Sequence, residues 1–429
     1  MKIAIVYPEV YDIARFGKKR KEFPPFGVLY LATIVSAQNG MEVEVFSVES
    51  NQEILDFTKF DVVAFSIPSS VTYDIIKCVR FNSSYANGAL IIAGGVHTTI
   101  FPEQTLHDLK MHAVCIGNGE ETILELLRQK EARQFSHVKG ICYLVDGNIV
   151  FTEKRPLKKN LDHLPAIPAR HLLPDPDFIM TNRLSNTNLR MTHVMICQGC
   201  PFSCNFCASQ QKQMQYRSEW HIHQELQYLK DTYGIEGFAV VGDNFLVNKR
   251  KVRNICECIG NLGLKWSTLS RVDTVDYDSL EIMHDAGCIE IKFGVESGSE
   301  TILKAMGKGI SVNQIYNAIK MTHSIGIRVK VFIIHGYPGE NMETTQETIA
   351  MLSNLSGMIE RVSLFRFVPL PGSCVYDQAK ENRLIITEND WSSCHIHHNP
   401  NHWWGDEEDF VAVEKSFRLL DKFIFEKWG

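Results

Sequence analysis

Three cysteines near the middle of the chain, Cys200, Cys204 and Cys207, are the residues whose type and spacing most clearly suggest chemistry. They follow the pattern C-x3-C-x2-C, and an aromatic residue, Phe206, precedes the last of them. A loop this short can direct three thiolates onto one small inorganic centre. Thiolates are soft ligands that suit iron–sulfur clusters or zinc. Three protein ligands leave one metal position open, which favours a reactive centre over a purely structural one.

A zinc site is the alternative metal centre. Cys197 lies just upstream, so that Cys197-x2-Cys200 and Cys204-x2-Cys207 form two pairs. The pairs of a structural zinc site are usually separated by roughly 12–20 residues, so that each lies on its own turn. Here only three residues intervene, and four thiolates so close in sequence would not readily form a tetrahedron. The spacing therefore favours a cluster over zinc, and over buried cysteines that pack as small apolar groups.

The cysteine motif resembles the cluster motif of the radical S-adenosylmethionine (radical SAM) enzymes. In that family the three cysteines hold a [4Fe–4S] cluster, S-adenosylmethionine chelates the fourth iron, and one-electron reduction releases a 5′-deoxyadenosyl radical. The resemblance implies that Cys200, Cys204 and Cys207 are the cluster ligands, that Cys197 is not one, and that Phe206 places backbone against the adenine. It also implies a reductant protein of the flavodoxin or ferredoxin type as electron donor.

The chain from residue 191 to about 385 alternates between strand and helix patterns. We expect strands at 194–196, 237–241, 264–270, 288–296, 328–334 and 361–368, and helices at 219–233, 278–286, 312–324 and 344–355. This makes about six βα units, as in a partial (β/α)6 TIM-type barrel. Catalytic groups of such barrels gather at the C-terminal ends of the strands.

The loops after these strands match segments that bind S-adenosylmethionine in radical SAM domains. Gly242-Asp243-Asn244 matches the segment that contacts its amino group, where a carboxylate can accept hydrogen bonds from an ammonium group. Glu296 and Ser297 match the segment that meets the ribose or the methionine moiety. His335-Gly336 begins the turn that lies near the adenine in that family.

The first 134 residues show a similar alternation. We expect strands at 1–7, 43–48, 61–66, 89–93 and 114–116, with helices at 28–39 and from about 120 to 129. This order predicts an α/β domain with a doubly wound, Rossmann-like parallel sheet. Ligands of such sheets bind beyond the carboxyl ends of the strands, and the loops there supply the candidate contacts Ser66, Gly94, Gly95, His97 and Gly117.

These loops together resemble the cobalamin-binding (B12-binding) domain that precedes many radical SAM domains. The matching segments are Pro24-Pro25-Phe26-Gly27, Gly94-Gly95-Val96-His97 and Gly117-Asn118-Gly119-Glu120. Many corrinoid-binding domains carry Asp-x-His-x-x-Gly, whose His coordinates cobalt, whereas this chain has Ala14 at the His position. The resemblance makes cobalamin a candidate cofactor without a cobalt-ligating His in that loop. For His97, a packing role and a ligand-contacting role both stay open.

Two further regions lie outside these domains. Residues 135–190 are expected to form a hairpin, with strands at 141–145 and 149–151, followed by a proline-rich linker. Residues 386–429 are expected to form a capping or substrate-facing region that ends in an amphipathic helix over 408–427. Metal binding, a substrate-facing wall and simple packing stay open for the tail residues Cys394, His395, His397, His398, His402, Trp403 and Trp404.

The composition is that of an ordinary globular protein. The chain has 429 residues, 45% hydrophobic and 22% charged, which allows two or three domains. A net charge of −6 argues against general nucleic-acid binding. We expect no signal peptide, and no membrane span because no apolar run reaches about 18 residues. Twelve cysteines in a chain that does not need disulfides to fold indicate the reducing cytoplasm.

The leading hypothesis is a radical SAM enzyme acting on a small-molecule or peptide substrate, and two reactions stay open. In the first, cobalamin delivers a methyl group to a substrate carbon. In the second, the N-terminal domain binds no cobalamin and the radical drives a dehydration or rearrangement, as in radical diol dehydratases. Methylthiolation is disfavoured because Cys78, Cys115 and Cys142 are too dispersed for a second cluster. The cysteine motif also argues against a non-enzymatic corrinoid- or nucleotide-binding regulator.

Overall fold

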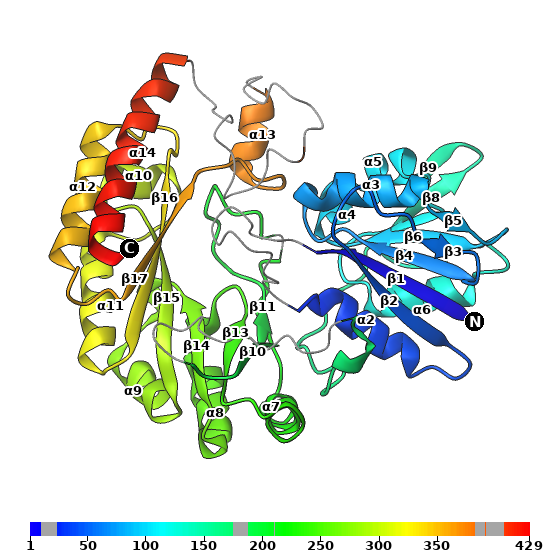
Figure 1. The fold of residues 1–429 in the computed structure, drawn as a ribbon, viewed down its shortest axis with the longest axis horizontal. Helices are drawn as coiled ribbons and strands as arrows, with labels where there is room; N and C mark the ends of the chain where they lie inside the picture. Colours follow the sequence, from blue (N-terminus) through cyan, green and yellow to red (C-terminus); the bar gives the residue numbers. More distant parts are fainter. Residues whose placement is uncertain (10–23, 175–187, 210, 382–390, 392–406) are drawn as a thin grey trace. The chain divides into compact units, whose positions relative to one another are not determined.

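The computed structural model describes residues 1–9, 24–174, 188–209, 211–381, 391 and 407–429. The chain forms two compact units, the first comprising Met1–Lys159, His163–Phe178 and Asn389–His395 and the second comprising Asn160–Asp162, Ile179–Glu388 and Ile396–Gly429. Each unit is built on its own large sheet (Figure 1). In these described parts, no helix has the length and apolar character needed to cross a membrane. Ala14 and the tail residues Cys394, His395, His397, His398, His402, Trp403 and Trp404 lie outside the described residues.

The sheet of the first unit has seven strands in the order β2-β1-β4-β6-β7-β8-β9. Neighbours from β2 to β7 pair in parallel, as the sequence predicted, and β8 and β9 pair antiparallel. The expected hairpin therefore forms, and it extends this same sheet. The strands are β1 (Lys2–Pro8), β2 (Glu42–Val48), β4 (Val62–Ser66), β6 (Leu90–Gly94), β7 (Ala113–Cys115), β8 (Ile141–Val145) and β9 (Asn148–Phe151).

Helices cover both faces of this sheet (Figure 1). This explains why β1 is buried from Ile3 to Pro8 without alternation, as in other parallel sheets that are covered on both sides. A short parallel pair, β3 (Asp56–Phe57) and β5 (Ser84–Tyr85), lies outside the main sheet. The helices are α2 (Phe26–Ser36) and α6 (Glu120–Arg128) on one face, and α3 (Tyr73–Asn82), α4 (Val96–Ile100) and α5 (Pro102–Asp108) on the other.

The sheet of the second unit has six parallel strands that follow one another in chain order, as the sequence predicted for a partial barrel. They are β10 (Met191–Met195), β13 (Gly237–Val241), β14 (Lys265–Ser270), β15 (Cys288–Glu296), β16 (Arg328–His335) and β17 (Arg361–Arg366). The helices between them are α7 (Glu219–Tyr233), α8 (Lys249–Ile259), α9 (Tyr277–Asp285), α10 (Glu300–Ala305), α11 (Val312–Ser324) and α12 (Met342–Asn354).

Alternation along the strands separates the core from the barrel interior. On β15, Ile291, Phe293 and Val295 face outward into one apolar cluster with the surrounding helices. Because side chains alternate along a strand, Gly294 faces the other way, into the barrel. A two-stranded antiparallel ribbon of β11 (Cys197–Gln198) and β12 (Gln215–Tyr216) frames the cysteine loop.

Two helices follow the last strand, α13 (Cys374–Glu381) and α14 (Glu407–Trp428). The expected final helix is thus present, and it packs against α12 and β17 (Figure 1). Leu420 and Ile424 of α14 join the apolar cluster of the barrel. The Trp428 indole donates to the carbonyl of Ile359 at 2.8 Å and so fastens the end of the helix.

Candidate functional site

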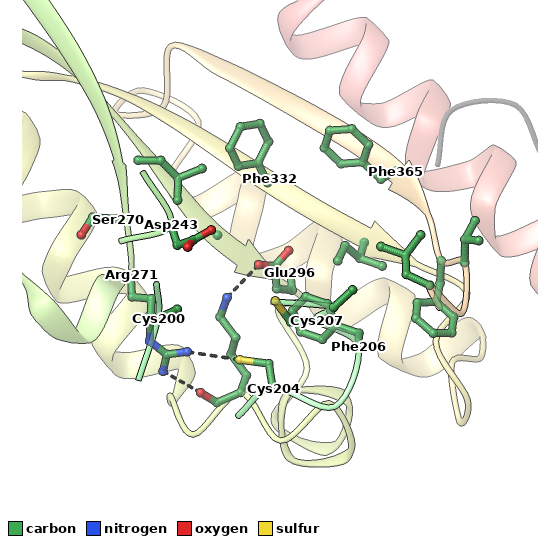
Figure 2. A pocket seen from close by; sticks show the side chains of 18 of the residues that line it. Cys200, Cys204, Phe206, Cys207, Asp243, Ser270, Arg271, Glu296, Phe332 and Phe365 are labelled. Atoms are coloured by element: carbon green, nitrogen blue, oxygen red, sulfur yellow. Dashed lines mark hydrogen bonds and ion pairs between the residues drawn. The ribbon is translucent and has the colours of Figure 1, made fainter. Parts of the chain in front are cut away.

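A cavity of about 380 Å³ lies at the C-terminal ends of the strands of the second unit. Its wall includes all three motif cysteines, together with the predicted residues Phe206, Asp243 and Glu296 (Figure 2). The wall also has a largely apolar part at β14, β16, β17 and the loop after β17, made by Leu269, Phe332, Ile334, Phe365, Phe367, Val368 and Leu370. The fold thus brings the cysteine loop and two of the predicted carboxylates to one cavity.

Backbone hydrogen bonds fix the cysteine loop on both sides. The Gly199 N–H donates to the Asp243 carboxylate at 2.7 Å, and the Cys200 N–H donates to the carbonyl of Gln211 at 2.9 Å. Further along, the Asn205 N–H donates to the carbonyl of Met306 at 2.9 Å. Gly199 has φ +92°, and a Cβ there would lie 3.0 Å from the carbonyl carbon of Gln213. This position therefore requires glycine.

Gly242 packs directly against Cys197, and this contact accounts for the glycine. A Cβ on Gly242 would overlap the Cys197 sulfur and lie 2.9 Å from the Cys197 carbonyl oxygen. Cys197 is 1% exposed and does not line the cavity. Burial, followed by the nearby charge of Asp243, raises the pKa of the Cys197 thiol to about 12. Cys197 is therefore a protonated packing residue beneath the loop that carries Asp243.

Glu296 is held in the cavity wall by an unusual backbone and a buried ion pair. It has φ +68°, and the β15–β16 register shifts between Gly294 and Glu296, so a bulge redirects its carboxylate. Lys308 lies 2.7 Å from it, and the two side chains are only 6–8% exposed. A Cβ on Gly294 would stand 2.5 Å from the Glu296 carboxylate and 3.0 Å from the Lys308 ammonium. The glycine therefore makes room for the pair.

Arg271 and Lys308 also line the cavity, and no role was predicted for either of them from the sequence. Arg271 follows the last residue of β14 directly, and its Nη1 donates to the Cys204 sulfur at 3.4 Å. Lys308 stands between Gly307 and Gly309, both in the left-handed region with φ +61° and +67°. A cation directly after a barrel strand, and a lysine flanked by two glycines, are the signals that could have drawn attention to them.

The other predicted residues of this unit do not line the cavity and bond within the protein. The Asn244 Oδ1 accepts from the Ser270 hydroxyl at 2.8 Å. The Ser297 hydroxyl lies 3.3 Å from that of Thr348 on α12. His335 contacts the hydroxyls of Thr345 at 3.0 Å and Ser416 at 3.3 Å. Burial, followed by the charge of Arg366, lowers the pKa of His335 to about 4, so this ring is neutral at pH 7.

Gly336 and Glu340 belong to the turn after His335. Gly336 has φ +93°, which favours glycine. The Glu340 carboxylate accepts from the Thr344 hydroxyl at 3.1 Å. Burial raises the pKa of Glu340 to about 7. This turn thus joins β16 to the start of α12.

In the first unit, the predicted loop residues gather at one edge of the sheet. Ser66 and Gly94 are the last residues of β4 and β6 and are paired neighbours. Gly95 has φ +126°, and a Cβ there would lie 2.7 Å from the carbonyl carbon of Ile67. Gly117 has φ +81° and donates to the Thr99 hydroxyl at 2.9 Å. A Cβ on Gly117 would meet nothing within 4 Å, so the space beside it is open.

His97 lies at the same edge but is fully buried, at 0% exposure. Its Nδ1 lies 2.9 Å from the Ser70 hydroxyl, and its ring packs 4.5 Å from Tyr73 and 5.0 Å from Trp391. Burial lowers the pKa of His97 to about 4. Of the two roles left open for His97, the described contacts are those of packing and hydrogen bonding. Trp391 belongs to the C-terminal segment, which the sequence did not place in this unit.

The three motif thiols share one cavity, where they could act together as metal ligands. Cys200, Cys204 and Cys207 are free cysteines around one cavity. In the parts of the chain that the structure describes, no three His, Cys, Asp or Glu side chains converge as ligands of one metal ion. Three soft sulfurs, with no fourth ligand converging on them among the described residues, suit an iron–sulfur cluster with an open position.

Two family models match the chain, one for each unit. Residues 15–127 match the B12 binding domain, and residues 194–352 match the radical SAM superfamily. The chain is 30% identical over 385 residues to "Uncharacterized methyltransferase PH0819" of Pyrococcus horikoshii, an alignment that covers 85% of this chain and 80% of that one. It is also 25% identical to the anaerobic magnesium-protoporphyrin IX monomethyl ester cyclase of Cereibacter sphaeroides, over 82% of this chain and 59% of the cyclase.

A solved structure shares the fold across both units. The radical S-adenosylmethionine methyltransferase TsrM of Kitasatospora setae, solved with cobalamin and a [4Fe–4S] cluster, superposes with a TM-score of 0.67. The match covers 90% of this chain and 75% of TsrM at 14% sequence identity, and therefore speaks for the fold alone. The family models and the relative at 30% identity lead to one assignment. The chain belongs to the radical SAM superfamily and carries a B12-binding domain before its radical SAM domain.

Proposed function

We propose that this protein is a cobalamin-dependent radical SAM methyltransferase that methylates a carbon of a small-molecule substrate. The observation that carries the proposal is the cavity in which three free cysteines meet the buried pair of Glu296 and Lys308. When bound, the cluster, S-adenosylmethionine and cobalamin supply a radical that removes a substrate hydrogen atom and a methyl group that replaces it. The residues of this chain bind and orient these groups.

The cysteine loop and the charged residues of the cavity would share this binding. Cys200, Cys204 and Cys207 would hold the cluster as thiolates, which are the form of cysteine that binds metal. Asp243 is already fixed by the Gly199 N–H, and its remaining lone pairs can accept from an ammonium group. Lys308 is a buried cation that suits a carboxylate, and Glu296 can accept from a hydroxyl group. S-adenosylmethionine carries groups of all three kinds.

The apolar side of the cavity would receive the substrate. The rings of Phe332 and Phe365 lie 5.7 Å apart and belong to its wall. Both rings are only partly buried, so an apolar part of a substrate could bury them further, at a gain of about 25 cal/mol per Å² of covered area. An apolar wall also excludes water from a reactive radical. A small molecule with an apolar carbon at the reaction site suits this cavity.

In the first unit we propose that the edge formed by Ser66, Gly94, Gly95 and Gly117 faces cobalamin, with His97 supporting it from within. Backbone at Gly95 and Gly117 lies in conformations that leave no side chain in the way. The open space beside Gly117 leaves backbone there that phosphate and amide groups of a corrinoid could reach. Because Ala14 stands where many such domains have a cobalt ligand, no cobalt bond from that position is proposed.

Methyl transfer is favoured over the alternative of radical dehydration or rearrangement without cobalamin. The relative at 30% identity is described as a methyltransferase, and the B12-binding domain model matches the N-terminal unit. The relative at 25% identity is named as a cyclase, so another reaction name also occurs among similar chains. We further propose that the protein works in the reducing cytoplasm with a flavodoxin- or ferredoxin-type electron donor. A reductant and a substrate are requirements of the superfamily.

Matched cysteine variants test this proposal. After anaerobic reconstitution with iron and sulfide, Cys204→Ala should lose bound iron and should no longer cleave S-adenosylmethionine to 5′-deoxyadenosine. Cys197→Ala is the control, because that thiol lies outside the cavity wall, and it should keep both. Full iron content and cleavage in Cys204→Ala would reject the cluster assignment and the reaction built on it.

A further inference from the structure

Arg271 connects the barrel to one of the motif cysteines. It stands immediately after β14, and its Nη1 donates to the Cys204 sulfur at 3.4 Å (Figure 2). The structure describes two hydrogen bonds to the motif sulfurs, and the bond from Arg271 is the one whose donor is a charged side chain. The other is a weaker bond from the backbone N–H of Ser209 to the Cys207 sulfur at 3.5 Å. One of the three thiolates therefore sits in a different electrostatic environment from the other two.

The guanidinium is held so that it cannot turn away from the sulfur. Its Nε and Nη2 donate to the two oxygens of Asp273, both at 2.9 Å. Nη2 also donates to the carbonyl of Lys308 at 2.6 Å. The Phe202 ring lies 3.8 Å from the guanidinium carbon, and the whole residue is 6% exposed. The guanidinium is thus bonded to Asp273 along one edge and stacked on Phe202 through its face. These contacts hold its remaining donor, Nη1, in place toward the sulfur.

Arg366 lines the same cavity but is differently engaged. Its Nη1 and Nη2 donate to the Glu414 carboxylate at 2.5 and 3.1 Å. Its guanidinium carbon lies 3.8 Å from the ring of Phe417. None of these described contacts involves a cysteine. Arg366 is therefore a matched cation in the same wall without the bond to sulfur.

A hydrogen bond to a cluster sulfur favours the reduced state. Reduction adds one electron, and part of that negative charge lies on the sulfur ligands. A positively charged N–H donor therefore binds the reduced cluster more strongly than the oxidised one, which raises the reduction potential. The effect is larger where water is excluded, because the effective dielectric constant is lower there.

We propose that Arg271 is a positioning residue that sets the reduction potential of the cluster through its hydrogen bond to Cys204. The inference rests on the proposed function, because it requires the three cysteines to hold a redox-active cluster. Asp273 serves this role by fixing the guanidinium, and Phe202 shields it from water. Arg271 thereby makes the cluster easier to reduce by the electron donor.

The test is a redox titration of reconstituted protein with mediator dyes, followed by the electron paramagnetic resonance signal of the reduced cluster. Arg271→Met should lower the equilibrium constant for one-electron reduction at least tenfold. This corresponds to a fall in the midpoint potential of about 59 mV or more. Arg271→Lys keeps the charge but loses the fork, so its potential should fall by less. Arg366→Met, the matched control, should retain the wild-type potential.

Three results would overturn the inference. The first is a wild-type potential in an Arg271→Met protein with full iron content. The second is an equal drop in Arg366→Met, which would mean that any cation of the wall has the effect. If Arg271→Met fails to fold, Asp273→Asn replaces it, because it keeps Arg271 but loosens its anchor, and an unchanged potential there is the third. All three leave the proposed function intact, whereas a wild-type chain that binds no iron rejects the proposed function itself.

Discussion

The ion pair of Glu296 and Lys308 permits a quantitative prediction. Both side chains are 6–8% exposed and lie 2.7 Å apart. Removing one partner leaves the other charge buried without compensation, which typically costs about 3–5 kcal/mol. Removing both charges is often close to neutral, because neither desolvation cost remains. We therefore expect Lys308→Met to be strongly destabilising and the double variant Glu296→Gln/Lys308→Met to recover most of the loss.

Scanning calorimetry of the cluster-free, reduced protein measures this difference. For domains of about 150–250 residues, 1 kcal/mol shifts the unfolding midpoint by about 2–4 °C, so Lys308→Met should lower it by about 6–20 °C. The control is Lys304→Met on α10, because Lys304 is exposed and should shift the midpoint by less than about 2 °C. A Lys308→Met midpoint equal to that of the control would refute the account of a buried, mutually dependent pair.

Three further changes have effects whose direction follows from the structure. Gly242→Ala should cost about 1–3 kcal/mol in urea unfolding, because its Cβ would overlap Cys197, and wild-type stability would contradict this packing. The pKa of His335 is lowered to about 4, so between pH 6.5 and 4 the unfolded chain binds a proton that the folded chain does not. Stability should therefore fall with falling pH by at most about 1.4 kcal/mol per unit, and an equally steep fall in His335→Gln would exclude this ring as a source. The pKa of Glu340 is raised to about 7, so its folded form releases its proton later than its unfolded form as pH rises, and stability is lost from about pH 4.5 to 7. Glu340→Gln should therefore be more stable than wild type at pH 8 in the same assay, and a less stable variant would be inconsistent with a carboxylate whose burial its hydrogen bonds only partly offset.

The elements that sequence reasoning located best have strong local signals. The helices α7 and α11 and the strands β13 and β15 begin and end where the sequence predicted. Helix α7 has Ser218 as its N-cap and Gly234, in the left-handed region, as its C-cap. Helix α11 has a capping box formed by Ser311 and Gln314. Such signals lie within a few residues of each helix end and can be read without the fold.

Other elements were less readable because their stability comes from packing. The sequence did not identify α8, whose first turn carries several basic residues. It is held by Val252, Ile255, Cys256 and Ile259, whose side chains enter the barrel core. The attachment of the hairpin to the first sheet was also not predicted, because strand pairing between β7 and β8 depends on contacts distant in sequence.

The residues of the site also differ in how readily they can be predicted, depending on whether they form a local motif or meet only in the fold. The cysteine motif is a local pattern, so the sequence alone was enough to single it out. The bond from Arg271 to Cys204 spans 67 positions, and the pair of Glu296 and Lys308 spans 12, so neither appears as a motif. Ser297 and His335 were placed correctly at strand ends, but nearby hydroxyl groups hold their side chains away from the cavity wall.

We expect one chain to hold both an iron–sulfur cluster and cobalamin. The most direct measurement is an iron and cobalt assay on one sample of protein purified without oxygen and supplied with hydroxocobalamin. We predict about four iron ions per chain, together with near-stoichiometric cobalt. Iron without cobalt would contradict cobalamin-dependent methyl transfer, and a chain without iron would contradict the radical SAM chemistry on which the whole account rests.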